Sequence, residues 1–171
     1  MDLFEKIERS AFLGAEFITW LWFRAEEGGG DFELPGELGT VKLLFTDKLT
    51  MRSEALDEQR DSFTGGCPTE SAEARTALKV GKLVDSARIA VAQGDQLWSF
   101  TLRTEPLMLS QIKLPEVLSE ESEEAFLERM YLTEQLEERY HGLLTLFLRC
   151  RLSGRWEAEE LPAIRAWIQQ G

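Results

Sequence analysis

Apolar residues cluster most densely near the start of the chain, in the segment FLGAEFITWLWFRAE, Phe12 to Glu26. At helical spacing these residues form an apolar arc that is broader than the stripe of roughly 100° on a surface helix. Such a helix needs cover on most of its sides, so we expect it at the centre of a core; the alternative is a helix that docks on a membrane or a partner. Gly28, Gly29 and Gly30 predict its end, because consecutive glycines favour loop conformations. Before it, Met1 to Ser10 also alternates at helical spacing.

From Thr40 the alternation changes to the period of a β-strand. The strand-like runs are residues 40–45, 49–55, 60–64, 83–91 and 97–104. The first two flank the polar turn Thr46-Asp47-Lys48, and the last two flank Gln93-Gly94-Asp95, so each pair predicts a β-hairpin. Strands that are joined by short turns indicate an antiparallel sheet.

Helical patterns return between the two hairpins and after the second. PTESAEARTALKVGK, residues 68–82, predicts a helix that Thr69 or Ser71 can cap and that Gly81 ends. Residues 107–115 either connect to the last part of the chain or add a short strand. The remaining predictions are a long amphipathic helix that opens at Ser119 and can bend at Gly142, and a short helix over residues 156–170.

Together these elements predict an α+β fold. We expect an antiparallel sheet of about four to six strands, built from hairpins with one intervening helix, with the apolar N-terminal helix on one face and the long C-terminal helix nearby. A chain of 171 residues with 43% hydrophobic content can bury one sizeable core, so we expect a single domain over residues 1–171. Five tryptophans and ten phenylalanines exceed what we expect one core to cover, which favours a homodimer.

Charge argues against a broad nucleic-acid surface. The chain has 31 acidic and 19 basic residues and a formal net charge of −12, so DNA binding requires a local basic patch. Lys79, Lys82 and Arg88 surround a predicted helix end and strand start, where they could share one phosphate-binding surface. Alternatively, they solvate that surface or pair with Asp85. The bases near the C-terminus of the long helix, where the helix dipole favours cations without any DNA role, are Arg149, Arg151 and Arg155.

Few residues suggest catalysis, and we expect no enzymatic activity, cofactor or metal site. His141 is the only histidine, Cys67 has no base at a fixed spacing, and Cys150 is interpreted as a packing residue of the long helix. The acids from Ser119 to Glu124 suggest either a metal cluster or the ordinary acidic start of a helix. Two cysteines, no visible signal sequence and no transmembrane segment predict a cytoplasmic protein.

The order of motifs resembles a known family. The segment ESAEARTALKVGKLVDSARIAVAQGDQLWSFTLRTEPLMLSQIKLPEVL resembles the C-terminal half of the recombination-associated RdgC proteins. The shared pattern is a short helix with Arg75, then Gly81-Lys82 before a strand, a hairpin, and Lys113-Leu114 leading into a final long helix. FLGAEFITWLWFRAE is similar to the opening of the same half, so the resemblance covers nearly the whole chain.

This resemblance implies a non-catalytic protein, because RdgC-like proteins form ring-shaped dimers around duplex DNA and restrain recombinase filaments. Lys82 stands where the family has a DNA-facing lysine, whereas Gly65, Gly66 and Cys67 stand where it has polar and basic residues. Two functions follow as expectations. One is a nucleoid-associated recombination modulator that contacts duplex DNA weakly and oligomerises. The other is an acidic interaction module that binds a recombinase or another DNA-processing protein and has no DNA binding of its own.

Overall fold

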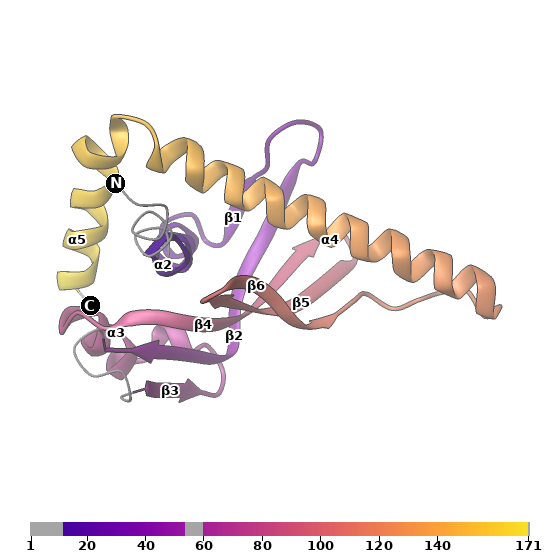
Figure 1. Cartoon of the computed structure of the whole chain (residues 1–171), viewed down its shortest axis with the longest axis horizontal. Helices are drawn as coiled ribbons and strands as arrows, with labels where there is room; N and C mark the ends of the chain where they lie inside the picture. Colours follow the sequence, from indigo (N-terminus) through magenta and orange to yellow (C-terminus); the bar gives the residue numbers. More distant parts are fainter. Residues whose placement is uncertain (1–11, 54–59, 171) are drawn as a thin grey trace, which may run out of the picture.

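The computed structural model describes residues 12–53 and 60–170, and the predicted helix in Met1 to Ser10 lies outside these ranges. It confirms the α+β fold: a six-stranded antiparallel sheet is combined with an N-terminal helix and a long C-terminal helix (Figure 1). In chain order the elements are α2 (Phe12–Glu27), β1 (Asp31–Glu33), β2 (Thr40–Arg52), β3 (Arg60–Thr64), the 3₁₀ turn η1 (Pro68–Glu70), α3 (Ala72–Lys79), β4 (Leu83–Gln93), β5 (Gln96–Thr104), β6 (Leu107–Lys113), α4 (Ser122–Arg151), the π-helical turn η2 (Trp156–Glu160) and α5 (Leu161–Gln170).

The sheet has the strand order β1-β2-β4-β5-β6, and β3 pairs with the far end of β2. The predicted second hairpin is confirmed, since β4 and β5 pair antiparallel up to Gln93 and Gln96 on either side of a tight turn. Residues 107–113 form β6, which settles the alternative that the sequence left open for this segment. The intervening helix is also confirmed: the Ser71 side chain caps α3 by accepting from the Ala74 N–H, and Gly81 follows its end with a φ of 84°.

The predicted first hairpin is wrong. Residues 46–48 form no turn but a bulge in one continuous strand: Phe45 pairs with Ile89 and Leu49 with Ala87, so three residues of β2 face a single residue of β4. Asp47, with a φ of 55°, bonds through its backbone to the loop after β3 instead of reversing the chain. Because the residues on both sides of the bulge bury their side chains in the same core, pairing with β4 overrides the local turn preference.

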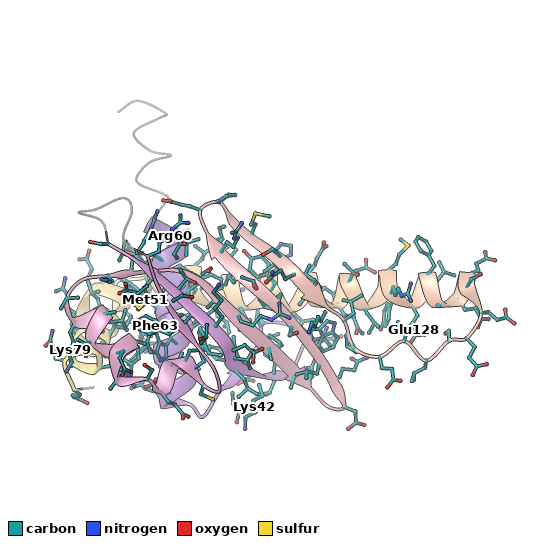
Figure 2. All side chains as sticks on the ribbon, turned by 90° about the horizontal axis from the view of Figure 1, so that it is seen from below. Lys42, Met51, Arg60, Phe63, Lys79 and Glu128 are labelled. Carbon is teal, nitrogen blue, oxygen red and sulfur yellow. The ribbon has the colours of Figure 1, made fainter. Side chains whose placement is uncertain are left out.

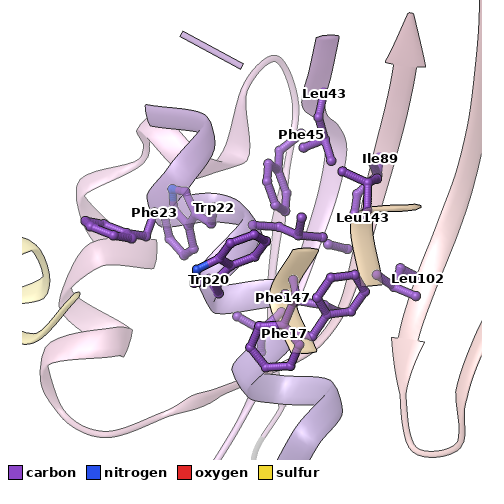
Figure 3. Packing of buried hydrophobic residues seen from close by; sticks show 14 of the residues in the cluster. Phe17, Trp20, Trp22, Phe23, Leu43, Phe45, Ile89, Leu102, Leu143 and Phe147 are labelled. Carbon is purple, nitrogen blue, oxygen red and sulfur yellow. The ribbon is translucent and has the colours of Figure 1, made fainter. Parts of the chain in front are cut away.

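The core lies between the sheet and α2, as the apolar arc predicted. Phe17 and Trp22 of α2 are fully buried, and Phe17 packs against Phe147 of α4 with ring centroids 5.2 Å apart (Figure 3). Gly14 lies within α2 and allows close approach to β5, because a Cβ at this position would lie 2.7 Å from the carbonyl oxygen of Thr104. The N-terminal helix is therefore the central layer of the domain.

One chain buries more of its tryptophan side chains than we expected from their number. Trp20, Trp22, Trp98 and Trp156 are buried, and the half-buried Trp167 of α5 packs edge-on against Trp22. Buried Glu160 accepts from the Trp20 indole at 2.7 Å and so connects the C-terminal turn to α2. Tryptophan content alone therefore gives no reason for a dimer.

The long helix α4 is continuous through Gly142, where a Cβ would come within 3.3 Å of the Leu34 methyl groups. It starts at Ser122 rather than Ser119, and its first turns extend beyond the sheet (Figure 1). In the part of the chain that the structure describes, no helix has the length and apolar character needed to span a membrane.

Candidate nucleic-acid interface

Helices α2 and α4 lie against one face of β4 and β5, and the other face of this part of the sheet is open to solvent (Figures 1 and 2). We call it the open face and assign its side chains from strand alternation and register. They are Lys42, Leu44 and Thr50 of β2, Ser86, Arg88, Ala90 and Ala92 of β4, Leu97, Ser99, Thr101 and Arg103 of β5, and Met108, Ser110 and Lys113 of β6. None of these is acidic, and the acidic side chains that pair with this face are at the β1 edge of the sheet, where Asp31 is opposite Lys42 and Glu33 opposite Thr40.

A hollow of about 770 Å³ lies in the open face beside Arg88. It is lined by Asp47, Lys48, Ser86, Arg88, Thr101, Arg103, Ser110, Gln111, Ile112 and Lys113. Two irregularities flank it: the bulge of β2 opposite Arg88, and a register shift of β6 near Gln111, which has a φ of 50°. Because β2 and β6 both depart from regular pairing here, the hollow depends on the strand register and not on any local motif.

The Arg88 guanidinium is held in a defined orientation by neutral acceptors. Its Nη1 donates to the carbonyl oxygen of Gln111 at 2.6 Å, and its Nη2 donates to the Ser99 hydroxyl at 2.9 Å. No carboxylate within residues 12–53 and 60–170 lies at ion-pair distance from it. The half-buried side chain therefore keeps an uncompensated positive charge, and its five N–H donors leave capacity for an anion.

Three more bases line the hollow and are exposed: Lys48, Arg103 and Lys113. Among the described residues, none of the three forms an ion pair with a carboxylate. With Arg88 they make four bases against the single acid Asp47, a formal local charge of 4 − 1 = +3. Serine and threonine hydroxyls between them add neutral donors, so the hollow combines the groups that bind phosphate oxygens.

The expected shared surface of Lys79, Lys82 and Arg88 is not formed. Lys82 makes an ion pair with Asp61 and lines a separate groove between α3 and β3, while Lys79 ends α3 (Figure 2). The register shift between Thr50 and Met51 explains the separation, because it turns Lys82 towards the helix side while Arg88 stays on the open face.

Asp85 lies at the start of β4 beside two other bases. Its carboxylate lies 3.6 Å from Arg60 and 3.9 Å from Arg52, so it links the start of β4 to β2 and β3. The sequence placed Lys48 in a turn and gave no reason to connect it with Arg103 or Lys113. The one usable signal for the open face was the alternation of small polar and basic residues along β4 and β5.

The other candidate groups do not come together. His141 is exposed beside Tyr140, Cys67 is exposed in its loop, and burial raises the pKa of the half-buried Cys150 thiol. Within the described ranges, no group of three or more histidine, cysteine, aspartate or glutamate side chains could hold a metal ion, so the acidic start of α4 is interpreted as a helix N-terminus.

No protein-family model matches this chain, and no curated protein gives a significant match.

Proposed function

We propose that this protein is a non-enzymatic, RdgC-like protein that modulates DNA or recombinase transactions through weak, non-specific contact with duplex DNA. The observation that carries the proposal is the hollow around Arg88, where four basic side chains face the single acid Asp47 and form no ion pair with a carboxylate of the described residues. Its position differs from the Lys82 surface that the family resemblance implies, because Lys82 is paired with Asp61. The proposal therefore moves the DNA contact to Arg88, Lys48, Arg103 and Lys113.

Weak binding follows from the charges. The four bases can neutralise only a few phosphates, and the net charge of −12 opposes the approach of DNA at longer range. We expect no sequence preference because of the shape of the surface. The edges of nucleotide bases are read by an element that enters a DNA groove, whereas a broad sheet face contacts the sugar-phosphate backbone.

A second candidate function is an acidic interaction module for a DNA-processing protein. Residues 120–138 contain eight glutamates and one arginine, and the exposed apolar side chains Phe126 and Met130 lie in the same part of α4. A segment of this kind could occupy a basic, partly apolar surface of a recombinase and compete there with DNA.

Fluorescence anisotropy with two unrelated duplexes over a salt series tests the proposal. We expect measurable binding at low salt and about the same affinity for both sequences. The double substitution Arg103→Glu/Lys113→Glu should weaken binding about tenfold or more and reduce the salt slope by about two units. The matched control is Arg149→Glu/Arg165→Glu, which makes the same charge change at exposed positions of α4 and α5 and should have a much smaller effect.

The outcomes separate the alternatives. If the wild type does not bind either duplex at low salt, the DNA function fails and the interaction module takes its place. If Lys82→Ala abolishes binding while the Arg103/Lys113 variant retains it, the interface lies on the α3 side, as the family resemblance implied.

A further inference from the structure

The first turns of α4 carry an apolar surface that nothing in the described chain covers. We call residues 122–131 the arm; the buried residues of α4 begin only at Leu132. The arm extends beyond the sheet (Figure 1). Its exposed apolar residues, with their exposed fractions, are Phe126 (59%), Leu127 (57%), Met130 (55%) and Tyr131 (58%). Clusters of this kind on a folded surface usually mark an interaction site.

The arm is held as a defined structure by the segment that leads into it. Glu128 accepts hydrogen bonds from the backbone N–H groups of Leu118 and Ser119, both at 3.0 Å, and from the Ser119 hydroxyl at 2.7 Å (Figure 2). Phe126 and Met130 line a groove of about 520 Å³ along the helix. An ordered apolar groove costs little conformational entropy on docking, which favours recognition of a partner.

Charge restricts what the partner can be. The arm holds three glutamates and one arginine, a formal charge of −2, and residues 120–138 around it hold eight glutamates and one arginine in total, so a second arm would be repelled. A suitable surface must be basic and partly apolar. The open face meets both conditions. Its hollow holds four bases and the exposed apolar Ile112 (44%), and its other exposed apolar residues are Leu44 (43%), Leu97 (52%) and Met108 (42%).

An arm cannot reach the open face of its own chain. The indole N–H of Trp98, on the covered face of β5, donates to the carbonyl oxygen of Leu132 at 3.0 Å, so α4 leaves the domain from the covered side. Because α4 is one continuous helix, the arm continues in that direction and the sheet lies between it and the open face. A contact between the two surfaces requires two molecules.

We propose that the arm of one copy docks on the open face of a second copy, with its glutamates near the bases around Arg88 and its apolar residues near Leu97 and Met108. The dimensions agree: ten helical residues span about 15 Å, and β2, β4, β5 and β6 at about 4.8 Å spacing span a similar width. The docked arm and DNA would occupy the same surface, so self-association and DNA binding should compete. The docking itself does not require that DNA binds.

Light scattering coupled to size-exclusion chromatography, at concentrations up to about 100 μM and at several salt concentrations, tests the contact. We expect the wild-type mass to exceed that of a monomer and to fall as salt increases. The arm variant Phe126→Gln/Met130→Gln and the face variant Arg103→Glu/Lys113→Glu should each be monomeric. The matched controls Val80→Gln/Leu152→Gln, at apolar positions exposed to 70% and 82%, and Arg149→Glu/Arg165→Glu should associate like the wild type.

Mixing the two monomeric variants gives the decisive result. The face variant still has an intact arm and the arm variant an intact open face, so a mixture should form one-to-one dimers. A contact between two arms or between two open faces would not be restored by mixing. A monomeric wild type at low salt, self-association that persists in both variants, or a mixture that stays monomeric would each overturn the proposal.

DNA binding provides an independent readout. The arm variant should bind duplex DNA at least as well as the wild type, because its open face is intact, whereas the face variant should lose both activities. If no variant or wild type binds DNA but the mixture still forms dimers, the proposed function fails and the docking stands.

Discussion

The guanidinium carbon of Arg139 lies 4.3 Å from the centre of the Trp98 indole, so a helix and the sheet meet through a buried cation–π contact. The same indole donates to the carbonyl oxygen of Leu132, about two helical turns closer to the arm. Desolvation lowers the pKa of Arg139, and the charge of Glu138 offsets this only in part. Trp98 therefore determines where α4 leaves the sheet and the direction in which the arm extends.

We predict that Trp98→Phe lowers the free energy of unfolding by about 2 kcal/mol, because it removes the indole hydrogen bond, weakens the cation–π contact and leaves a cavity. Urea denaturation of purified protein measures this change. Leu97→Ala, the neighbouring residue on the open face with 52% exposure, is the control and should change stability by less than about 0.5 kcal/mol. Equal effects of the two substitutions would contradict the central role of Trp98.

We predict that Gly14→Ala destabilises the fold by about 1–3 kcal/mol, because the added methyl group would overlap the backbone of Thr104 and separate α2 from β5. Gly154→Ala is the matched control: no atom lies within 4 Å of its added Cβ, so stability should be unchanged or higher by up to about 1 kcal/mol. Thermal denaturation of both variants compares them. A neutral Gly14→Ala would show that α2 does not approach β5 so closely.

We predict that the contact between the arm and the preceding segment weakens at acidic pH. Hydrogen bonds from the Leu118 backbone and then from Ser119 lower the pKa of Glu128. A lowered pKa means that the folded state favours the carboxylate, so the contact is complete above the ordinary glutamate pKa of about 4.3 and is lost as pH falls through the lowered value.

An NMR titration of the Leu118 and Ser119 amide protons measures this transition. Their chemical shifts should move with a midpoint below the ordinary glutamate value, and Glu128→Gln should remove the step. Glu134→Gln, on the same helix, should leave it in place. A midpoint at or above the ordinary value would show that Glu128 does not hold this segment.

Several elements could be predicted because their causes are local. The apolar arc of α2, its glycine end, the Ser71 cap of α3 and the β4–β5 hairpin each follow from residues a few positions apart in the sequence. The prediction of a first hairpin was wrong because Asp47 and its polar neighbours have the sequence character of a turn. Their real role as a bulge depends on pairing with β4, whose partner residues lie about forty positions later.

The candidate site shows the same division. The sequence alone determines which segments can become helices and strands. It also shows the excess of acidic residues and the basic residues Lys82 and Arg88. Only the tertiary structure decides that Lys82 faces Asp61 beside α3 while Arg88 joins Lys48, Arg103 and Lys113. The physical reason is strand register: a shift of one residue exchanges the two faces of a sheet, and the pairing that sets it is made by distant residues whose core side chains must fit together.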